Sequence, residues 1–461
     1  MSAKELSGAD HRASQASYVT PIGASGETSS PPLIESSTTA VSPWTLYSPW
    51  QRWGFLLVLF GVTISNYFDF FVLSVVLEPI KKEFHVSDTM LGLLSGACFA
   101  LVYAVAALPI ARWADRGDRP TVIAAALSGW SAMTALCGLA QSFWQLAIAR
   151  FGVGIAEPGA VPPSLSLIAD YFPPEKRATA VTVFSNGASA VGWFVGIGLG
   201  GYIAARYGWR VAFLAAGLPG LVLAIVVRVF LAEPRRLLGF PRMDPQAESF
   251  AESITHLRRK QSYLFVLAGV SVYCIFAYGI TVFAPSFMLR SLHTTLEQVS
   301  VTWGSAIAVA NILGAVIGGR MADRLSRRDI RWYAWLPALA CLFALPLYWL
   351  ALTAERAWIF ISVEFLAELV LSIGTPVSAM AILAVCGRCR RSLASAAVYS
   401  SMVLIGGTLG PFLSGALSDV FQAEHGQDSL RYALISVCLF LVPAAFCFYA
   451  AARAMPEELE D

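Results

Sequence analysis

Twelve apolar runs, each long enough to cross a bilayer as a helix, limit the fold of this chain more than any other feature. About 20 apolar helical residues cross about 30 Å of hydrocarbon. Only α-helices and closed barrels satisfy their backbone polar groups in lipid, and these runs are too long and too uniformly apolar for barrel strands. The sequence therefore predicts an all-α membrane protein. Its expected spans are 53–77, 90–111, 121–140, 143–169, 178–204, 210–231, 263–289, 298–321, 332–352, 357–385, 393–418 and 430–452.

The composition agrees with a bilayer as the main solvent. Hydrophobic residues make up 57% of the chain and charged residues 13%, against about 45–50% and about 25% in ordinary soluble domains. A soluble protein of this length needs more surface charge to stay dissolved. The net charge of +2 gives no reason to expect nucleic acid as a partner.

Basic residues predict the orientation of the spans. They gather in the connections at 112–119, 176–177, 235–260, 324–331 and 388–391, and Lys81 and Lys82 are the main exception. The positive-inside rule places these connections and both termini in the cytoplasm, as an even number of spans requires. We expect a bacterial inner membrane as the location.

Polar stretches divide the chain. Residues 1–50 are rich in Ser, Thr, Gly and Pro and contain no apolar run, which predicts a disordered tail and not a secretory signal. A six-span bundle at 51–231 is expected to be followed by a cytoplasmic linker at 232–262. A second six-span bundle is expected at 263–453, before a short tail at 454–461.

The two halves carry the same motifs. "ARWADRGDRP" (111–120) follows the second run and "GRMADRLSRR" (319–328) follows the eighth, while "GAVPPSLSLIA" (159–169) in the fourth run matches "GTPVSAMAILA" (374–384) in the tenth. Duplicated six-helix halves are typical of secondary transporters, whose solute site lies near mid-membrane between the halves. The sequence predicts a carrier that moves a small solute by alternating access.

The repeated "xxADRxxxR" loop, with twelve spans in two halves, resembles the major facilitator superfamily over about residues 50–455. That resemblance implies two pseudo-symmetric six-helix bundles around a central cavity. "NYFDFFVLSVVLEPIKKEF" (66–84), "GVGIAEPGAVPPSLSLIADYFPPEKRATA" (152–180) and "YGWRVAFLAAGLPG" (207–220) further resemble the bacterial spinster-like branch. This branch implies an amphipathic or lipid-like solute. The chain departs from the usual pattern at Phe70, where Arg is common, and at Ala156 and Pro158, where Gly and Ala are common.

Three ionisable residues inside the first bundle are the main candidates for coupling transport to an ion gradient. By the resemblance, Asp69 and Glu157 occupy the two acidic positions of the branch. Burial of an unpaired carboxylate favours its protonated form, so either group can load and release a proton. The alternative is a structural hydrogen bond for Asp69 and a helix cap for Glu157. Arg150, on nearly the same helix face as Glu157, is expected to pair with Glu157 or Asp69, or to hold an anionic solute.

Helix breaks and a second acidic pair complete the predicted cavity. Pro158, Pro162 and Pro163 interrupt the fourth run and Pro376 interrupts the tenth, as is tolerated where backbone lines a cavity. Glu364 and Glu368 lie four residues apart and share a helix face. They are expected to meet a proton or a cationic solute, or to lie near the outer water layer.

The repeated loops are expected to gate the cytoplasmic side. By resemblance, Asp115 contacts the N-terminal end of a span in the other half, where the helix dipole favours an anion. Topology alone would explain the arginines but not the aspartates. The expected gating residues are Asp115, Arg116, Arg119, Asp323, Arg324, Arg327 and Arg328.

Other functions lack a signal. No Walker motif or strand–turn–helix nucleotide fingerprint is present, so we expect neither ATP drive nor a cofactor other than the coupling proton. A lone CxxC at Cys386 and Cys389 is a weak metal or redox signal, and we expect no metal site. The histidines lie outside the spans and no catalytic cluster is visible, so an enzyme is not expected. We expect a monomer. The alternatives left open are an organic anion symporter, a drug-type exporter, and a non-transporting receptor on a transporter scaffold.

Overall fold

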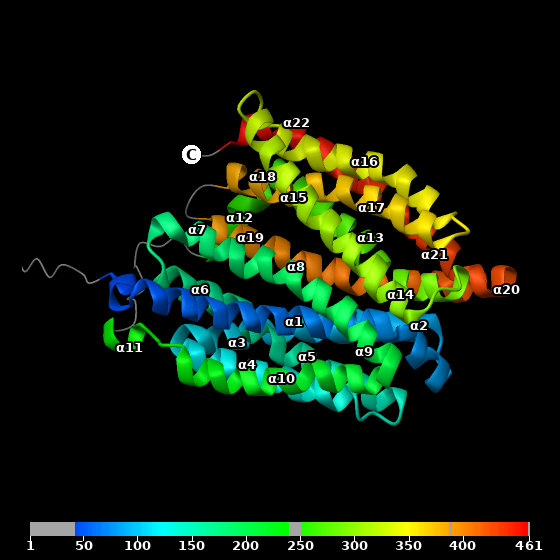
Figure 1. Ribbon diagram of the computed structural model, residues 1–461. Coiled ribbons are helices and arrows are strands. Elements are labelled where there is room, and N and C mark those ends of the chain that lie inside the picture. The colour runs from blue at the N-terminus through cyan, green and yellow to red at the C-terminus, as the bar shows by residue number, and fades with distance from the viewer. Residues whose placement is uncertain (1–41, 239–249, 387–389, 460–461) are drawn as a thin grey trace, which may run out of the picture. The chain divides into compact units, whose positions relative to one another are not determined.

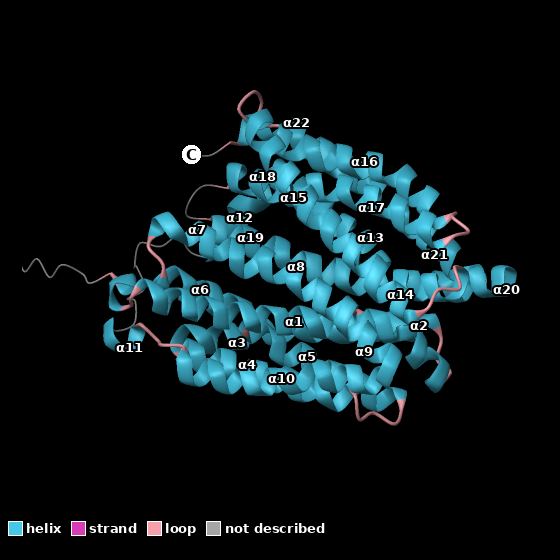
Figure 2. Ribbon diagram, viewed as in Figure 1, coloured by secondary structure: helices cyan, strands magenta, loops and turns pink. Residues whose placement is uncertain are grey.

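The computed structural model describes residues 42–238, 250–386 and 390–459, and these residues form helices joined by short turns (Figures 1 and 2). No strand occurs among the described residues. The predicted all-α membrane fold is therefore confirmed. The predicted tail at 1–50 lies outside the described residues up to residue 41, and its last part forms η1 (Pro43–Leu46) and the first turn of α1.

The first half contains six spanning segments, three of them interrupted. The unbroken ones are α1 (Pro49–Phe84), α4 (Arg119–Cys137) and α10 (Trp209–Phe230). The second span is α2 (Asp88–Ser95) with α3 (Ala97–Arg116), and the fourth is α5 (Phe143–Ala156), η2 (Glu157–Gly159) and α6 (Val161–Tyr171). The fifth comprises α7 (Pro174–Thr182), η3 (Val183–Gly187), α8 (Ala188–Trp193), η4 (Phe194–Leu199) and α9 (Gly200–Tyr207).

The second half repeats this pattern after α11 (Arg235–Leu238) and α12 (Phe250–Arg259), which lie in the predicted linker. Its unbroken spans are α13 (Gln261–Ser291) and α16 (Trp332–Leu352). The eighth span is α14 (Leu296–Gln298), η5 (Val299–Trp303) and α15 (Gly304–Ser326), and the tenth is α17 (Ala357–Gly374), η6 (Thr375–Val377) and α18 (Ser378–Val385). The last two are α19 (Arg391–Ser401), η7 (Met402–Gly407) and α20 (Thr408–His425), then η8 (Gly426–Asp428), α21 (Ser429–Cys438) and α22 (Leu441–Glu458).

Ten continuous helical segments of the described chain are long and apolar enough to span a membrane. This count is consistent with twelve spans. The segment Leu393–Glu458 contains two expected spans, and the expected span 143–169 is broken at Glu157–Gly159. Side-chain caps begin several helices: Ser48 accepts a hydrogen bond from the Gln51 backbone, and Ser87 accepts one from Met90. The turns therefore lie where Ser and Pro interrupt the apolar pattern.

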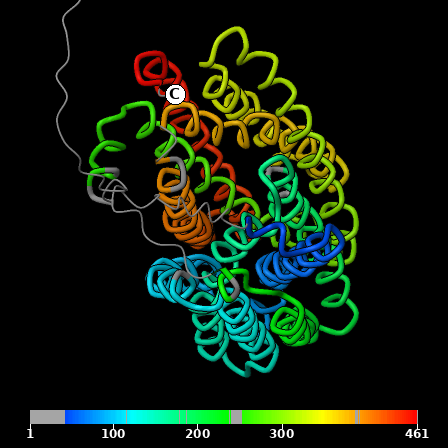
Figure 3. Tube along the Cα trace, turned by 90° about the vertical axis from the view of Figure 1, so that its left-hand side faces the viewer, coloured from blue at the N-terminus to red at the C-terminus, as the bar shows by residue number. Residues whose placement is uncertain are grey.

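Helices of each half pack mainly on one another. In the first half α4 contacts α5 and α10, and α1 contacts α8 and α10; in the second half α13 contacts α22, and α16 contacts α17 and α22. Figure 3 looks along the helices and shows the cyan helices of the first half in the lower part of the view and the yellow helices of the second half in the upper part. The halves meet where α2 contacts α20, α1 contacts α13, and α8 contacts α15.

Two ends of the helix bundle are distinguished below. The proximal end is where α1 begins at Pro49 and α22 ends at Glu458. The distal end is where α1 ends at Phe84 and α2 begins at Asp88 (right-hand side of Figure 1). Both repeated ADR loops, at the ends of α3 and α15, lie at the proximal end, as their shared motif predicts.

Candidate functional site

A buried ion pair joins three helices of the first half. Arg150 on α5 donates from a terminal guanidinium nitrogen to Asp69 Oδ2 on α1 over 2.9 Å. Thr134 on α4 donates its hydroxyl to Asp69 Oδ1. Asp69 is 3% exposed and Arg150 is 1% exposed. Of the partners expected for Arg150, the structure therefore selects Asp69, which is ion-paired and hydrogen-bonded and not a free carboxylate.

The Arg150 guanidinium retains some unused capacity. Its Nε atom is buried and has no hydrogen-bond partner, and its other face lies over the Phe99 ring at 5.9 Å. A buried guanidinium with a free N–H can donate a hydrogen bond to a second carboxylate without first breaking its bond to Asp69.

Glu157 lies where the fourth span breaks. α5 ends at Ala156, and Pro158 follows Glu157 in the 3₁₀ turn η2, so helical hydrogen bonding is interrupted at this carboxylate. Pro162 and Pro163 occupy the first turn of α6, where proline is tolerated. The Asn66 side chain lies within hydrogen-bonding reach of Glu157. Pro376 occupies the matching turn η6 of the tenth span. The predicted breaks are thus observed in both halves.

Tyrosines from both halves lie near Glu157, and spacing along the chain does not reveal this grouping. Tyr67 on α1 and Tyr103 on α3 belong to the first half, and Tyr278 on α13 and Tyr399 on α19 belong to the second; all four lie within electrostatic range of Glu157. The Phe70 and Tyr278 rings meet across the halves with centroids 5.8 Å apart. Glu157 therefore faces the boundary between the halves, whereas Asp69 and Arg150 lie within the first half. The sequence did offer one signal for the surroundings of Glu157: Asn66 lies one helical turn before Asp69 on α1, and its side chain reaches Glu157.

Glu364 and Glu368 form a separate acidic pair inside the second half. Trp303 donates its indole N–H to Glu364 Oε2 over 2.6 Å, and the Tyr348 hydroxyl donates to Glu368 Oε2 over 2.7 Å. Glu364 is buried, so its expected alternative location near the outer water layer does not fit. These carboxylates are held by neutral donors, and no hydrogen bond or ion pair in the described part of the chain joins them to Asp69 or Glu157.

The expected gating residues fall into two groups. The Asp115 side chain lies outside the described part of the structure, so its expected contact is not described. Arg116, Asp323, Arg324, Arg327 and Arg328 are exposed at the proximal end.

Arg119 is different because it is buried. It donates to Glu233 from its backbone N–H over 2.9 Å and from Nε over 3.0 Å, and it also pairs with Asp170 over 2.6 Å. Burial acts to raise the pKa of Glu233, but the hydrogen bonds from Arg119 outweigh it and hold that pKa below its ordinary value. Arg119 and Asp170 belong to the first half and Glu233 lies at the start of the predicted linker, so Arg119 ties the linker to the first bundle.

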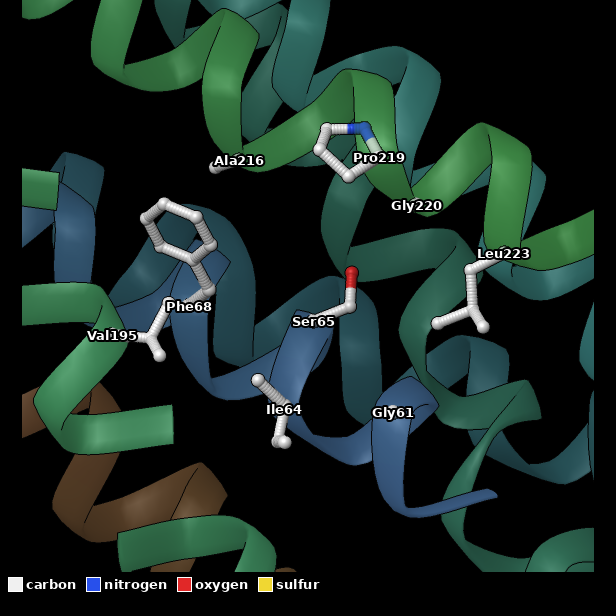
Figure 4. Close-up of a pocket in the computed structure, with 9 residues that line it drawn as sticks. All are labelled: Gly61, Ile64, Ser65, Phe68, Val195, Ala216, Pro219, Gly220 and Leu223. Carbon is white, nitrogen blue, oxygen red and sulfur yellow. The ribbon is translucent and has the colours of Figure 1, made fainter. Parts of the chain in front are cut away.

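An apolar cavity of about 250 Å³ lies between α1, η4 and α10 (Figure 4). Its lining includes Gly61, Ile64, Phe68, Pro219 and Leu223, and Ser65 contributes a hydroxyl. The cavity contains no ionisable side chain, so it adds hydrocarbon surface beside α1 and no group for coupling.

No cluster of three or more His, Cys, Asp or Glu side chains among the described residues is arranged to hold a metal ion. Cys386 is buried, and Cys389 of the CxxC pair lies outside the described residues.

Two halves of long apolar helices, the same helix breaks in both and charges buried among the helices are the architecture of a membrane carrier. Residues 59–367 match the family model of the Major Facilitator Superfamily, and the chain belongs to this family. It is a transporter and not an enzyme.

Its relatives agree with this assignment. The chain is 35% identical over 420 residues to an MFS-type efflux pump of Mycolicibacterium smegmatis, covering 90% of this chain and 96% of the relative. It is 26% identical to a sphingosine-1-phosphate transporter of Danio rerio, covering 86% and 82% of the two chains. A solved bacterial homologue of the human lysosomal transporter Spinster, described as inward-facing and unoccupied, superposes with a TM-score of 0.81 at 26% identity. That match covers 90% of this chain and all of the solved one. The resemblance to spinster-like transporters is confirmed.

Proposed function

We propose that this chain is a proton-coupled transporter of an amphipathic, lipid-like organic solute. The observation that carries the proposal is a charge imbalance: two carboxyl groups, Asp69 and Glu157, lie within electrostatic range of one buried guanidinium, Arg150, which forms an ion pair with Asp69. One guanidinium balances one negative charge, and an unbalanced charge in a dry interior is costly. A proton bound by the trio would balance the second negative charge.

The bound proton connects the trio to alternating access. When Asp69 holds the proton, Arg150 turns its open Nε donor toward Glu157; when Glu157 holds it, Arg150 stays with Asp69. Because Glu157 lies at the boundary between the halves among tyrosines of both, its charge changes what a solute meets there. A proton entering from one side thereby changes the solute site that faces the other.

The relatives support the choice of solute. One is named as a transporter of sphingosine-1-phosphate, an amphipathic lipid, and the solved neighbour is a homologue of Spinster. The apolar cavity beside Phe68 adds surface suited to a hydrocarbon chain. A drug-type exporter is the second candidate, because the 35% identical relative is an efflux pump. We further propose a monomer in a bacterial inner membrane with the proximal end in the cytoplasm, as the basic loops predict.

The test is uptake into proteoliposomes with and without an imposed pH gradient. A fluorescent analogue of sphingosine-1-phosphate serves as the lipid probe and ethidium as the drug probe. Asp69→Asn and Glu157→Gln should each lose the gradient-driven component by about tenfold or more, the scale of one missing charge interaction, while probe exchange without a gradient persists. The matched control Glu355→Gln changes an exposed distal carboxylate and should behave as the parent protein. Unchanged gradient-driven uptake in both variants would refute the coupling. Gradient-driven uptake of ethidium without uptake of the lipid analogue would favour the drug-type exporter.

A further inference from the structure

An arginine of the second half forms ion pairs with two carboxylates of the first half at the distal end. Arg290, in the last turn of α13, donates from Nε to Glu78 over 2.5 Å and from its two terminal nitrogens to the Asp88 carboxylate over 2.7 and 2.8 Å. Arg290 is 10% exposed, whereas Asp88 is fully buried. Such a two-pronged, largely dry contact is stronger than an exposed ion pair.

An aspartate of the second half binds the backbone at the start of α2. Asp419, on α20, accepts hydrogen bonds from the backbone N–H groups of Asp88 over 3.0 Å and Thr89 over 2.8 Å, and from the Thr89 hydroxyl. These N–H groups are the first of α2, where the helix dipole favours a negative charge. Ser418 adds a hydrogen bond to the Asp88 carboxylate over 2.8 Å. Side chain and backbone of one residue, Asp88, are thus held from the other half.

Glycines let α2 and α20 approach closely enough for these bonds to form. A Cβ on Gly415 would collide with the Asp88 carbonyl oxygen, and a Cβ on Gly92 would collide with the Pro411 carbonyl oxygen. A Cβ on Gly96 would meet the Gly407 carbonyl oxygen at 2.5 Å. The backbones are in contact along this line, and Asp88 is fully buried where they meet.

The charges of this network balance within each half, which suits a contact between halves that must separate and re-form. On the first half, Lys81 pairs with Asp88 over 2.8 Å, and Lys82 lies 3.9 Å from Glu78. On the second half, Arg290 and Asp419 carry opposite charges on helices that contact each other. Each half is neutral at this network, so opening the distal end separates no net charge.

We propose that Arg290 and Asp419 form a two-part latch on Asp88 and the start of α2 that holds the distal end closed and sets the resting state of the transporter. Arg290 binds the carboxylate of Asp88 and Asp419 binds its backbone, so the two grips reinforce each other. The latch opens in every transport cycle into two neutral faces. It depends neither on the solute nor on the coupling ion.

The test measures distal distances directly. Spin labels at Gln141→Cys and Glu355→Cys, exposed positions at the distal ends of α4 and α16, report the separation of the halves by pulsed electron spin resonance in nanodiscs, in a cysteine-free background that retains transport. Arg290→Gln and Asp419→Asn should each raise the ratio of distally open to closed protein by about tenfold, within the usual range of coupling between states. The double variant should shift it less than the product of the single effects, because both grips act on one residue.

An exposed cross-bundle pair on the same side provides the control. Arg206 lies 3.8 Å from Glu297, with side chains 58% and 51% exposed, so Arg206→Gln should leave the distance distribution unchanged. Arg290→Lys keeps the positive charge but loses the planar pair of donor nitrogens, so it should give an intermediate shift in the ratio of open to closed protein. It also replaces Arg290→Gln as the test if that variant fails to fold. Parent-like distances in Arg290→Lys and Asp419→Asn, or an equal shift in Arg206→Gln, would overturn the latch.

Discussion

Glu233→Gln should lower the stability of the first half more than any change at the exposed charges around it. Glu233 accepts three hydrogen bonds from Arg119, and the side chains of these two residues are 2% and 1% exposed. Gln offers one acceptor oxygen and no charge, so of its two carboxylate partners Arg119 keeps Asp170, which is 29% exposed, beside its hydrogen bond to the Ser166 hydroxyl. Breaking a buried pair by removing one partner costs about 3–5 kcal/mol. Because Asp170 remains, we expect about 3 kcal/mol.

The measurement is a thermal melt of detergent-purified protein followed by tryptophan fluorescence. For a unit the size of the first half, about 2–4 °C is lost per kcal/mol, so the melting temperature should fall by roughly 6–12 °C. The matched control is Arg236→Gln, which breaks the ion pair with Asp118 at 2.8 Å, where the side chains are 60% and 21% exposed. Exposed pairs contribute less than about 1 kcal/mol. If the two variants melt together, the Arg119–Glu233 pair does not stabilise the bundle as its burial implies.

The pH dependence of the same difference gives a second check. The folded-state pKa of Glu233 lies below its ordinary value of 4.5, because hydrogen bonds from Arg119 outweigh the opposing effect of burial. A lowered folded pKa contributes stability that is present above the unfolded pKa and is lost as the pH falls through the folded one. The melting difference between parent and Glu233→Gln should therefore be constant from pH 6 to 8 and shrink below about pH 4. A difference that grows on acidification would contradict the sign.

Two further predictions concern contacts between and within the halves. Gly415→Ala should shift the distal end toward the open state and lower the melting temperature, because its Cβ would strike the Asp88 carbonyl, whereas Gly319→Ala, with nothing within 4 Å of its Cβ, should behave as the parent in both measurements. Trp303→Phe removes the donor that Glu364 accepts from inside the second half and should cost about 1–3 kcal/mol in a thermal melt, whereas Trp144→Phe, on a side chain that is 68% exposed, should change the melting temperature by less than 2 °C, about the effect of a typical surface substitution.

Periodicity and composition predict the spans well because burial in lipid is a local property of each segment. The twelve runs, the break at Glu157 and the repeat of that break at Pro376 are all visible within short windows. The Asp69–Arg150 pair was within reach because both residues are charges that a bilayer does not tolerate alone.

The remaining contacts depend on which distant segments meet, and spacing along the chain does not encode that. Asp88 and Asp419 are far apart in sequence, and each resembles an ordinary loop residue until α2 and α20 are brought together. The exception to the positive-inside pattern at Lys81 and Lys82 was a usable signal. These lysines balance Asp88 and Glu78 in the distal network, so they serve local pairing and not topology.

The charged groups lie in three separate places, which indicates that coupling and closure of the distal end use different residues. The Asp69, Arg150 and Glu157 trio lies mid-span in the first half, the Glu364 and Glu368 pair lies inside the second, and the Arg290 and Asp419 latch lies at the distal end. Groups that exchange a proton must stay near neutral balance in a dry interior, while groups that hold two bodies together must release into water without separating net charge. The trio proposed for coupling meets the first requirement, and the proposed latch meets the second. Substitutions at the latch should therefore change how often the transporter opens without changing the proposed number of protons moved per solute, whereas Asp69→Asn should change that number.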